Sequence, residues 1–191
     1  MQKKIKDVIF MSACAPPSGG RNKVTQRLFR HFNMIWMTEL SVDSMKQIFK
    51  SIIDGFLELG PNKTLLDDSE DIIDAALELY NKIRIEKLPT PSKSHYTFNL
   101  RDLSKVIQGM LQVNADYFSD RSLLINCWIH ETSRQFRDRL LGEDIQWFDK
   151  EISNLHDVKF KLDKPAFLID QLIFSNVVDR NYKQNQDFPA F

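Results

Sequence analysis

The stretch from residue 91 to residue 111 constrains the fold of this chain more than any other part of the sequence. An extended segment, His95-Tyr96-Thr97-Phe98, leads there into a helix that is expected to begin after Asn99. Asparagine is a preferred N-cap residue, and the acidic Asp102 in the first turn suits the positive end of a helix dipole. Apolar residues then recur at helical spacing and predict one buried face: Leu100, Leu103, Val106, Ile107, Met110 and Leu111.

Arg101 lies in the same first turn, where its charge is not explained by the helix itself. A cation at a helix N-terminus opposes the helix dipole, whereas an anion bound near the helix start would account for it. The alternative is an arginine at the surface, or one in a salt bridge with Asp102 or another neighbour. The residues by themselves leave both interpretations open.

Three further stretches have the apolar periodicity of amphipathic helices. The first runs from Ser41 to Leu59 and ends at Gly60-Pro61, and the second runs from about residue 68 to residue 87, before Pro89. The third begins after Asp120 and continues to Gly142. The fold class is therefore predicted to be mainly α.

Two short apolar segments near the N-terminus are typical of strands instead. Asp7–Cys14 is a continuous apolar run of the kind found in strands that are buried on both faces, and Phe32–Met37 is the second candidate. Two strands do not make an independent sheet with helices on both faces. The N-terminus is therefore interpreted as the end of a larger α/β domain.

Composition limits the function classes. Lysine and arginine equal aspartate and glutamate, so the net charge is zero, which argues against a strongly basic nucleic-acid-binding protein. The only cysteines, Cys14 and Cys127, are far apart, which suits a reducing compartment. The apolar run from residue 8 to residue 15 is too short to span a membrane. We expect a soluble, cytosolic protein without a membrane partner.

Several motifs that would indicate a complete catalytic site are absent from these 191 residues. The loop at Ser18-Gly19-Gly20 lacks the GxxxxGK[ST] spacing of a Walker A loop, and no apolar run ends in the paired acids of a Walker B motif. His130-Glu131 belongs to HExxR, which lacks the second histidine of the HExxH zinc motif, so no metal site is expected. A phosphoryl-transfer site needs a phosphate cradle and a metal anchor as well as arginines. The chain alone is not expected to hydrolyse ATP.

Three segments of the chain resemble one family. They are similar to the third AAA+ module in the motor ring of dynein heavy chains, and their sequences resemble the axonemal type. The segments are SHYTFNLRDLSKVIQGM, FMSACAPPSGGRNKVTQRLFRHFNMIW and WIHETSRQFRDRLLGEDIQWF. The resemblance implies that residues 1–40 are the end of the α/β large subdomain, with about two strands. Residues 41–150 would then form the helical lid, and residues 151–191 a connector or loosely ordered tail.

The resemblance also assigns roles to arginines. Arg101, in NLRD, matches the sensor-2 residue that reaches the phosphates of ATP. Arg30, at the end of the short helix expected over Val24–His31, matches the arginine finger that acts on the neighbouring module, with Arg27 as the second choice. Magnesium would arrive with the nucleotide. The alternative is that Arg27 and Arg30 are simply solvated.

The function implied by the resemblance is that of a motor segment. The lid would sense ATP and pass that state around the ring, to drive the microtubule-based movement of cilia. The implied partners are the rest of the heavy-chain ring, the intermediate and light chains, and microtubules, in the cytoplasm, the cytoskeleton and the ciliary axoneme. Two alternatives remain: the lid of another AAA+ ATPase, and a stand-alone helical protein-interaction module.

Overall fold

The computed structural model describes residues 6–14, 22–160, 172–176 and 181–184. The chain divides into two compact units, Met1–Glu39 and Leu40–Phe191. The loop predicted at Ser18-Gly19-Gly20 lies outside the described residues.

The first unit contains one short helix, α1 (Gln26–Phe29), among its described residues. It covers half of the helix predicted over residues 24–31. The structure describes neither of the segments predicted as strands, Asp7–Cys14 and Phe32–Met37, as a strand. Their apolar side chains are exposed, with Ile9 at 95% and Ile35 at 84%. A strand is stabilised by ladder hydrogen bonds to a neighbour, and the described part of this unit supplies none.

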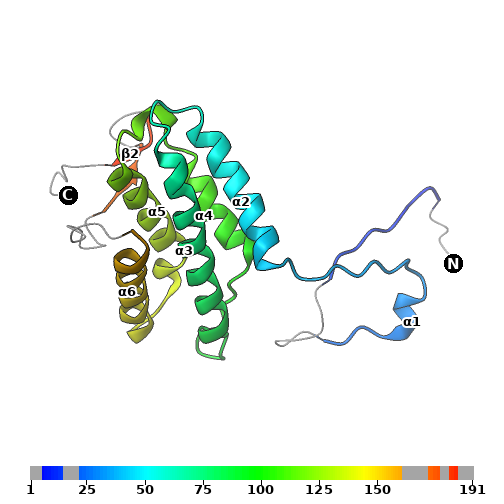
Figure 1. Cartoon of the computed structure of the whole chain (residues 1–191). Coiled ribbons are helices and arrows are strands. Elements are labelled where there is room, and N and C mark those ends of the chain that lie inside the picture. Colours follow the sequence, from blue (N-terminus) through cyan, green and yellow to red (C-terminus); the bar gives the residue numbers. More distant parts are fainter. Residues whose placement is uncertain (1–5, 15–21, 161–171, 177–180, 185–191) are drawn as a thin grey trace. The chain divides into compact units, whose positions relative to one another are not determined.

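The second unit is a helical bundle (Figure 1). Its helices are α2 (Val42–Leu57), α3 (Leu65–Glu86), α4 (Leu100–Met110), α5 (Arg121–Gln135) and α6 (Glu143–Leu155). Two 3₁₀ helices, η1 (Ala115–Tyr117) and η2 (Arg137–Arg139), and a π-helical turn, η3 (His156–Phe160), lie between or after them. Strands β1 (Phe174–Ser175) and β2 (Lys183–Gln184) pair antiparallel, with Phe174 opposite Gln184. The predicted mainly helical class is confirmed.

The helix starts agree well with the sequence signals. The side chains of Ser41, Asn99 and Asp120 each accept a hydrogen bond from a backbone N–H in the first turn of the adjoining helix, at 2.9–3.2 Å. Asn99 was predicted as a cap, and Ser41 and Asp120 stand where the other two helices were predicted to begin. The ends are predicted less well. The third predicted helix stops at Gln135 and turns through η2 before α6 begins. The first residues of the segment 151–191, expected to be a connector or loosely ordered tail, continue as α6 to Leu155 and as η3 to Phe160.

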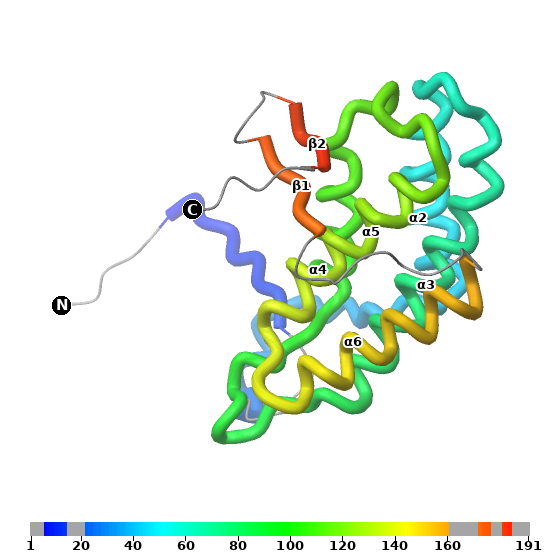
Figure 2. Tube along the Cα trace, turned by 90° about the vertical axis from the view of Figure 1, so that its left-hand side faces the viewer, coloured from blue at the N-terminus to red at the C-terminus, as the bar shows by residue number. Residues whose placement is uncertain are grey.

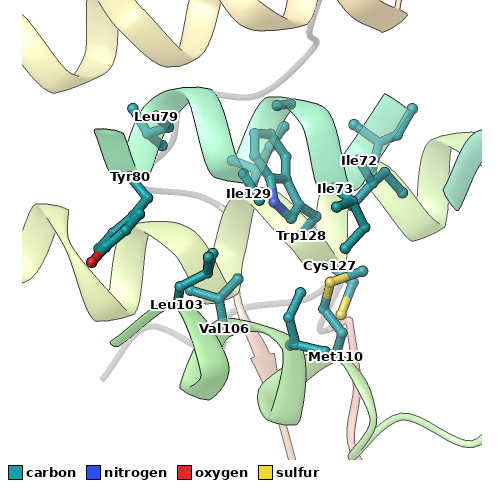
Figure 3. Packing of buried hydrophobic residues seen from close by; sticks show 14 of the residues in the cluster. Ile72, Ile73, Leu79, Tyr80, Leu103, Val106, Met110, Cys127, Trp128 and Ile129 are labelled. Carbon is teal, nitrogen blue, oxygen red and sulfur yellow. The ribbon is translucent and has the colours of Figure 1, made fainter. Parts of the chain in front are cut away.

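The core lies between α3, α4 and α5 (Figure 3). Trp128 of α5 is fully buried there, between Ile72 and Ile73 of α3 and Val106 and Met110 of α4. Helix α2 packs on α3 at one side, and α6 packs on α3 at another (Figure 2). Helix α6 packs on the bundle through Phe148, which is fully buried. This packing fixes α4, the helix that carries Arg101, within the bundle.

Candidate functional site

The start of α4 is held by two reciprocal hydrogen bonds. The backbone N–H of Arg101 donates to Oδ1 of Asn99 at 2.9 Å, and the backbone N–H of Asn99 donates to Oδ2 of Asp102 at 2.9 Å. This capping box satisfies two backbone donors that a helix otherwise leaves free. The backbone of Arg101 is therefore fixed at the first turn.

The Arg101 side chain itself is exposed. Within the part of the chain that the structure describes, its guanidinium makes no hydrogen bond or ion pair. The alternative of a salt bridge with Asp102 is not realised, because Oδ1 of Asp102 pairs with the Nη1 of Arg139 at 3.0 Å. Among the described residues, Arg101 is thus a cation at the positive end of a helix with no anion paired to it. That arrangement suits an anionic ligand.

Arg139, in η2, holds the segment that leads into α4. Its Nη2 donates to the backbone carbonyls of His95 and Thr97, at 3.1 and 3.2 Å. In return, the carbonyl of Arg139 lies 2.9 Å from Nε2 of His95. The guanidinium also lies over the ring of Phe98, 4.6 Å from its centroid. These contacts join η2 to the segment that precedes α4.

Asp144 anchors the same segment from its other end. This residue lies in the first turn of α6, where it accepts hydrogen bonds from Nζ of Lys87 at 2.9 Å, from Nζ of Lys93, and from the hydroxyl of Tyr96 at 2.9 Å. The oxygen of that hydroxyl accepts from the backbone N–H of Leu141 at 2.8 Å. The hydrogen bond from Lys93, together with those from Lys87 and Tyr96, lowers the pKa of Asp144 to about 2. No sequence motif marks this residue.

The HExxR motif has a structural place. Glu131 is fully buried and accepts hydrogen bonds from Nε and Nη2 of Arg134, at 3.1 and 2.6 Å, and from the hydroxyl of Tyr182. The Nδ1 of His130 lies 3.0 Å from the carbonyl of Leu172, and burial lowers the pKa of this histidine. Both residues therefore connect α5 to the β1–β2 hairpin. Among the described residues, no three potential metal ligands gather at one point.

The other predicted site residues lie in the first unit. Arg30 comes directly after the last residue of α1, and its Nε donates to Nε2 of His31 at 3.1 Å. Arg27 lies within α1. Both arginines are exposed. Exposure is required of a residue that acts on another protein surface, and it is equally expected of a solvated residue. They share one short helix, whereas Arg101 belongs to the second unit.

No described helix combines the length and the apolar character that a membrane span requires.

Comparison with known proteins gives two family matches. Residues 72–175 match the AAA+ lid domain, and residues 1–40 match the P-loop containing dynein motor region. The chain is 42% identical to human dynein axonemal heavy chain 6 over 97% of its own length, and 46% identical to mouse dynein axonemal heavy chain 1 over 78%. Human dynein axonemal heavy chain 3 is 37% identical over 94% of the chain. The chain spans only 4–5% of the length of these relatives.

Proposed function

Because this chain belongs to the AAA+ lid domain family and is similar to axonemal dynein heavy chains along most of its length, we propose that it is a segment of such a motor. In this proposal the segment comes from the third AAA+ module of the ring. Residues 1–40 are the end of the large subdomain, residues 41–150 the lid, and residues 151–191 the connector towards the next module. The lid responds to ATP in the third module.

The observation that carries the proposal is the environment of Arg101. Its backbone is fixed by the capping box, its side chain is exposed, and its nearest acidic neighbour, Asp102, is engaged by Arg139. A phosphate oxygen bound near the N-terminus of α4 would accept charge-assisted hydrogen bonds from this guanidinium. It would also lie at the positive end of the helix dipole. Arg101 therefore fits the part of a phosphate-sensing residue.

The chain contributes only part of the nucleotide site. Its 191 residues contain neither a Walker A loop nor a Walker B motif, so the phosphate cradle and the magnesium ligands would come from other parts of the motor. ATP, bound with its magnesium, would supply the negative charge to which the lid responds. Arg101 would move with α4 when it gains or loses the phosphate, and the bundle would move with it.

Arg30 is proposed as the arginine finger for the neighbouring module, with Arg27 as the second choice. A guanidinium at the end of a short helix can reach into an adjacent site and stabilise charge on a transferring phosphoryl group. The exposure of both residues supports this role. The partners in the intact assembly are the rest of the ring, the intermediate and light chains, and microtubules, within the axoneme of a cilium.

The test of the sensor is Arg101→Ala in a complete heavy-chain motor. Charge-assisted hydrogen bonds contribute about 1.5–3 kcal/mol, so the ATP concentration that half-saturates microtubule release should rise about tenfold to a hundredfold. Lys105→Ala is the matched control, because Lys105 is an exposed cation one turn further along α4. It should stay within about twofold of the wild type, as expected for an exposed surface substitution. The sensor assignment is abandoned if the two variants behave alike.

A stand-alone helical interaction module is the second candidate, and the bundle of the second unit is compatible with it. An immunoblot of whole cells and isolated cilia with an antibody against residues 91–111 separates the two. A single very large band, enriched in cilia, supports the motor segment. A band at 22.4 kDa supports the module instead, if the purified short chain is folded and monomeric and ATP has no effect on it.

A further inference from the structure

We propose that Arg139 is a positioning residue for Arg101: it fixes the start of α4 and neutralises Asp102, so that the net charge facing a bound phosphate stays positive. This inference rests on the proposed role of Arg101 as the phosphate sensor. Arg139 itself has no contact with the nucleotide in this proposal.

Arg139 contacts the start of α4 at several points. One guanidinium bridges three groups that precede or begin α4: the carbonyls of His95 and Thr97, and the carboxylate of Asp102. A planar guanidinium presents several donors in a fixed fork, which a lysine ammonium does not. Arg139 therefore joins the extended segment to the first helical turn, on both sides of the cap Asn99. The direction in which α4 leaves that segment is set by this contact.

The anchoring is mutual, which limits how η2 and the segment can slip past each other. The carbonyl of Arg139 lies 2.9 Å from the His95 ring nitrogen, and the Arg139 guanidinium covers the Phe98 ring at 4.6 Å. Phe98 in turn packs against Phe136, with ring centroids 5.9 Å apart. The turn between α5 and α6 is thus fastened to the start of α4. A displacement of that turn would displace Arg101.

Arg139 also neutralises the charge of Asp102. Asp102 is 7% exposed, and its carboxylate lies one residue from Arg101 in the first turn. Without Arg139, the described residues leave this charge with only the N–H of Asn99 as a partner. A buried carboxylate without a cation beside it would repel an incoming phosphate and offset the charge of Arg101. With Arg139 in place, the group of three carries one net positive charge.

Arg137 provides a matched control within the same 3₁₀ helix. It is also a partly buried arginine in a two-bond ion pair, with Nε 2.7 Å from Oδ1 and Nη2 3.1 Å from Oδ2 of Asp149. That pair joins η2 to α6 and not to the start of α4. Arg137→Met therefore removes an ion pair from η2 but keeps the contacts of Arg139 with the start of α4.

The experiment is a double-mutant cycle in the complete heavy-chain motor, with Arg139→Met, Arg101→Ala, the double variant and Arg137→Met. Methionine keeps an unbranched stem over Phe98 but removes every donor. We expect Arg139→Met to raise the half-saturating ATP concentration for microtubule release about fivefold, within the range of measured pairwise couplings. In the Arg101→Ala background the same change should have no further effect. Arg137→Met should leave the ATP dependence at the wild-type value.

Hydrogen exchange provides a second readout. Amides at residues 99–103 should exchange faster in Arg139→Met than in Arg137→Met. If the methionine variant does not assemble, Arg139→Lys replaces it in the cycle. Lysine can pair with Asp102 but cannot bridge both carbonyls, so the half-saturating ATP concentration should again rise, by a smaller factor.

The outcomes separate this inference from the proposed function. Wild-type ATP dependence of Arg101→Ala would overturn the sensor role and the inference with it. If Arg101→Ala weakens the ATP response as expected but Arg139→Met matches Arg137→Met, only the inference is overturned. The inference is also overturned if Arg139→Met raises the half-saturating ATP concentration by the same factor in the wild type and in Arg101→Ala. Arg139 would then act independently of Arg101.

Discussion

Gly109 of α4 is a residue whose replacement by alanine should destabilise the bundle, although alanine is the better helix former. An added Cβ would lie 1.9 Å from Oε2 of Glu131, 2.3 Å from its Cδ and 2.8 Å from its Cγ. Glu131 is fully buried on α5, where its carboxylate accepts hydrogen bonds from Arg134 and Tyr182. The carboxylate must therefore leave its position, or the two helices must separate.

The magnitude is set by two opposing effects. Replacing glycine by alanine within a helix gains about 1 kcal/mol. Breaking a buried ion pair costs about 3–5 kcal/mol when a charge is left buried without its partner. Because the Arg134 side chain is 46% exposed and can be hydrated again, the cost should lie at the lower end of that range. The net destabilisation of Gly109→Ala is then about 2–3 kcal/mol.

The assay is urea unfolding of the chain, monitored by circular dichroism of the helices. With a slope of about 1–3 kcal/mol per molar urea, the midpoint should fall by about 0.7–3 M. Gly55→Ala is the matched control, because Gly55 lies within α2 and an added Cβ there meets no atom within 4 Å. It should stabilise the chain by about 1 kcal/mol.

The Glu131→Ala background isolates the cause. All three atoms nearest to the added Cβ belong to the part of Glu131 that this change removes. Gly109→Ala should therefore become stabilising in that background, by about the same amount as Gly55→Ala. The reasoning is refuted if Gly109→Ala already stabilises the chain when Glu131 is present.

Two further predictions concern Arg30 and Asp144. In a complete motor, Arg30→Ala should slow ATP turnover at the adjacent module and not at its own. Single-turnover kinetics, with one module at a time made inactive, measures the two rates. Equal slowing at both sites would count against the arginine finger. The pKa of Asp144 is about 2 in the folded chain and 3.8 without its partners, so the stability from its ionised form is present above pH 3.8 and is lost as the pH falls towards 2. Asp144→Asn should lower the urea midpoint at pH 7 and flatten its decline between those pH values; a decline as steep as that of the wild type would contradict the assignment.

The sequence predicted the helices of the second unit because their signals are local. Apolar periodicity and the caps at Ser41, Asn99 and Asp120 depend on residues within one or two turns of each other. The segments predicted as strands in the first unit depend on contacts that are not local. A strand depends on a neighbour, and the apolar runs at residues 7–14 and 32–37 have none within the described part of that unit.

The candidate site was predicted in part. The position of Arg101 in the first turn of a capped helix can be read from the sequence, and its exposure agrees with the surface alternative as well as with a ligand. Arg139 and Asp144 could not be found in this way, because their partners lie far away along the chain, as His95 does from Arg139 and Lys87 from Asp144. In the sequence, Arg139 stands beside Arg137 and Asp138, and charge alone does not distinguish it from them. Only the tertiary packing shows that it contacts the start of α4.

The contact between Gly109 and Glu131 has a consequence for how such chains can diverge. A residue with a Cβ at position 109 is compatible only with a short side chain at position 131. A short side chain at 131 would in turn leave the hydroxyl of Tyr182 without its acceptor, and phenylalanine would then be the better residue at 182. We therefore expect the residues at positions 109, 131 and 182 to covary among related chains. A substitution at one of these positions should be tolerated only together with matching substitutions at the others.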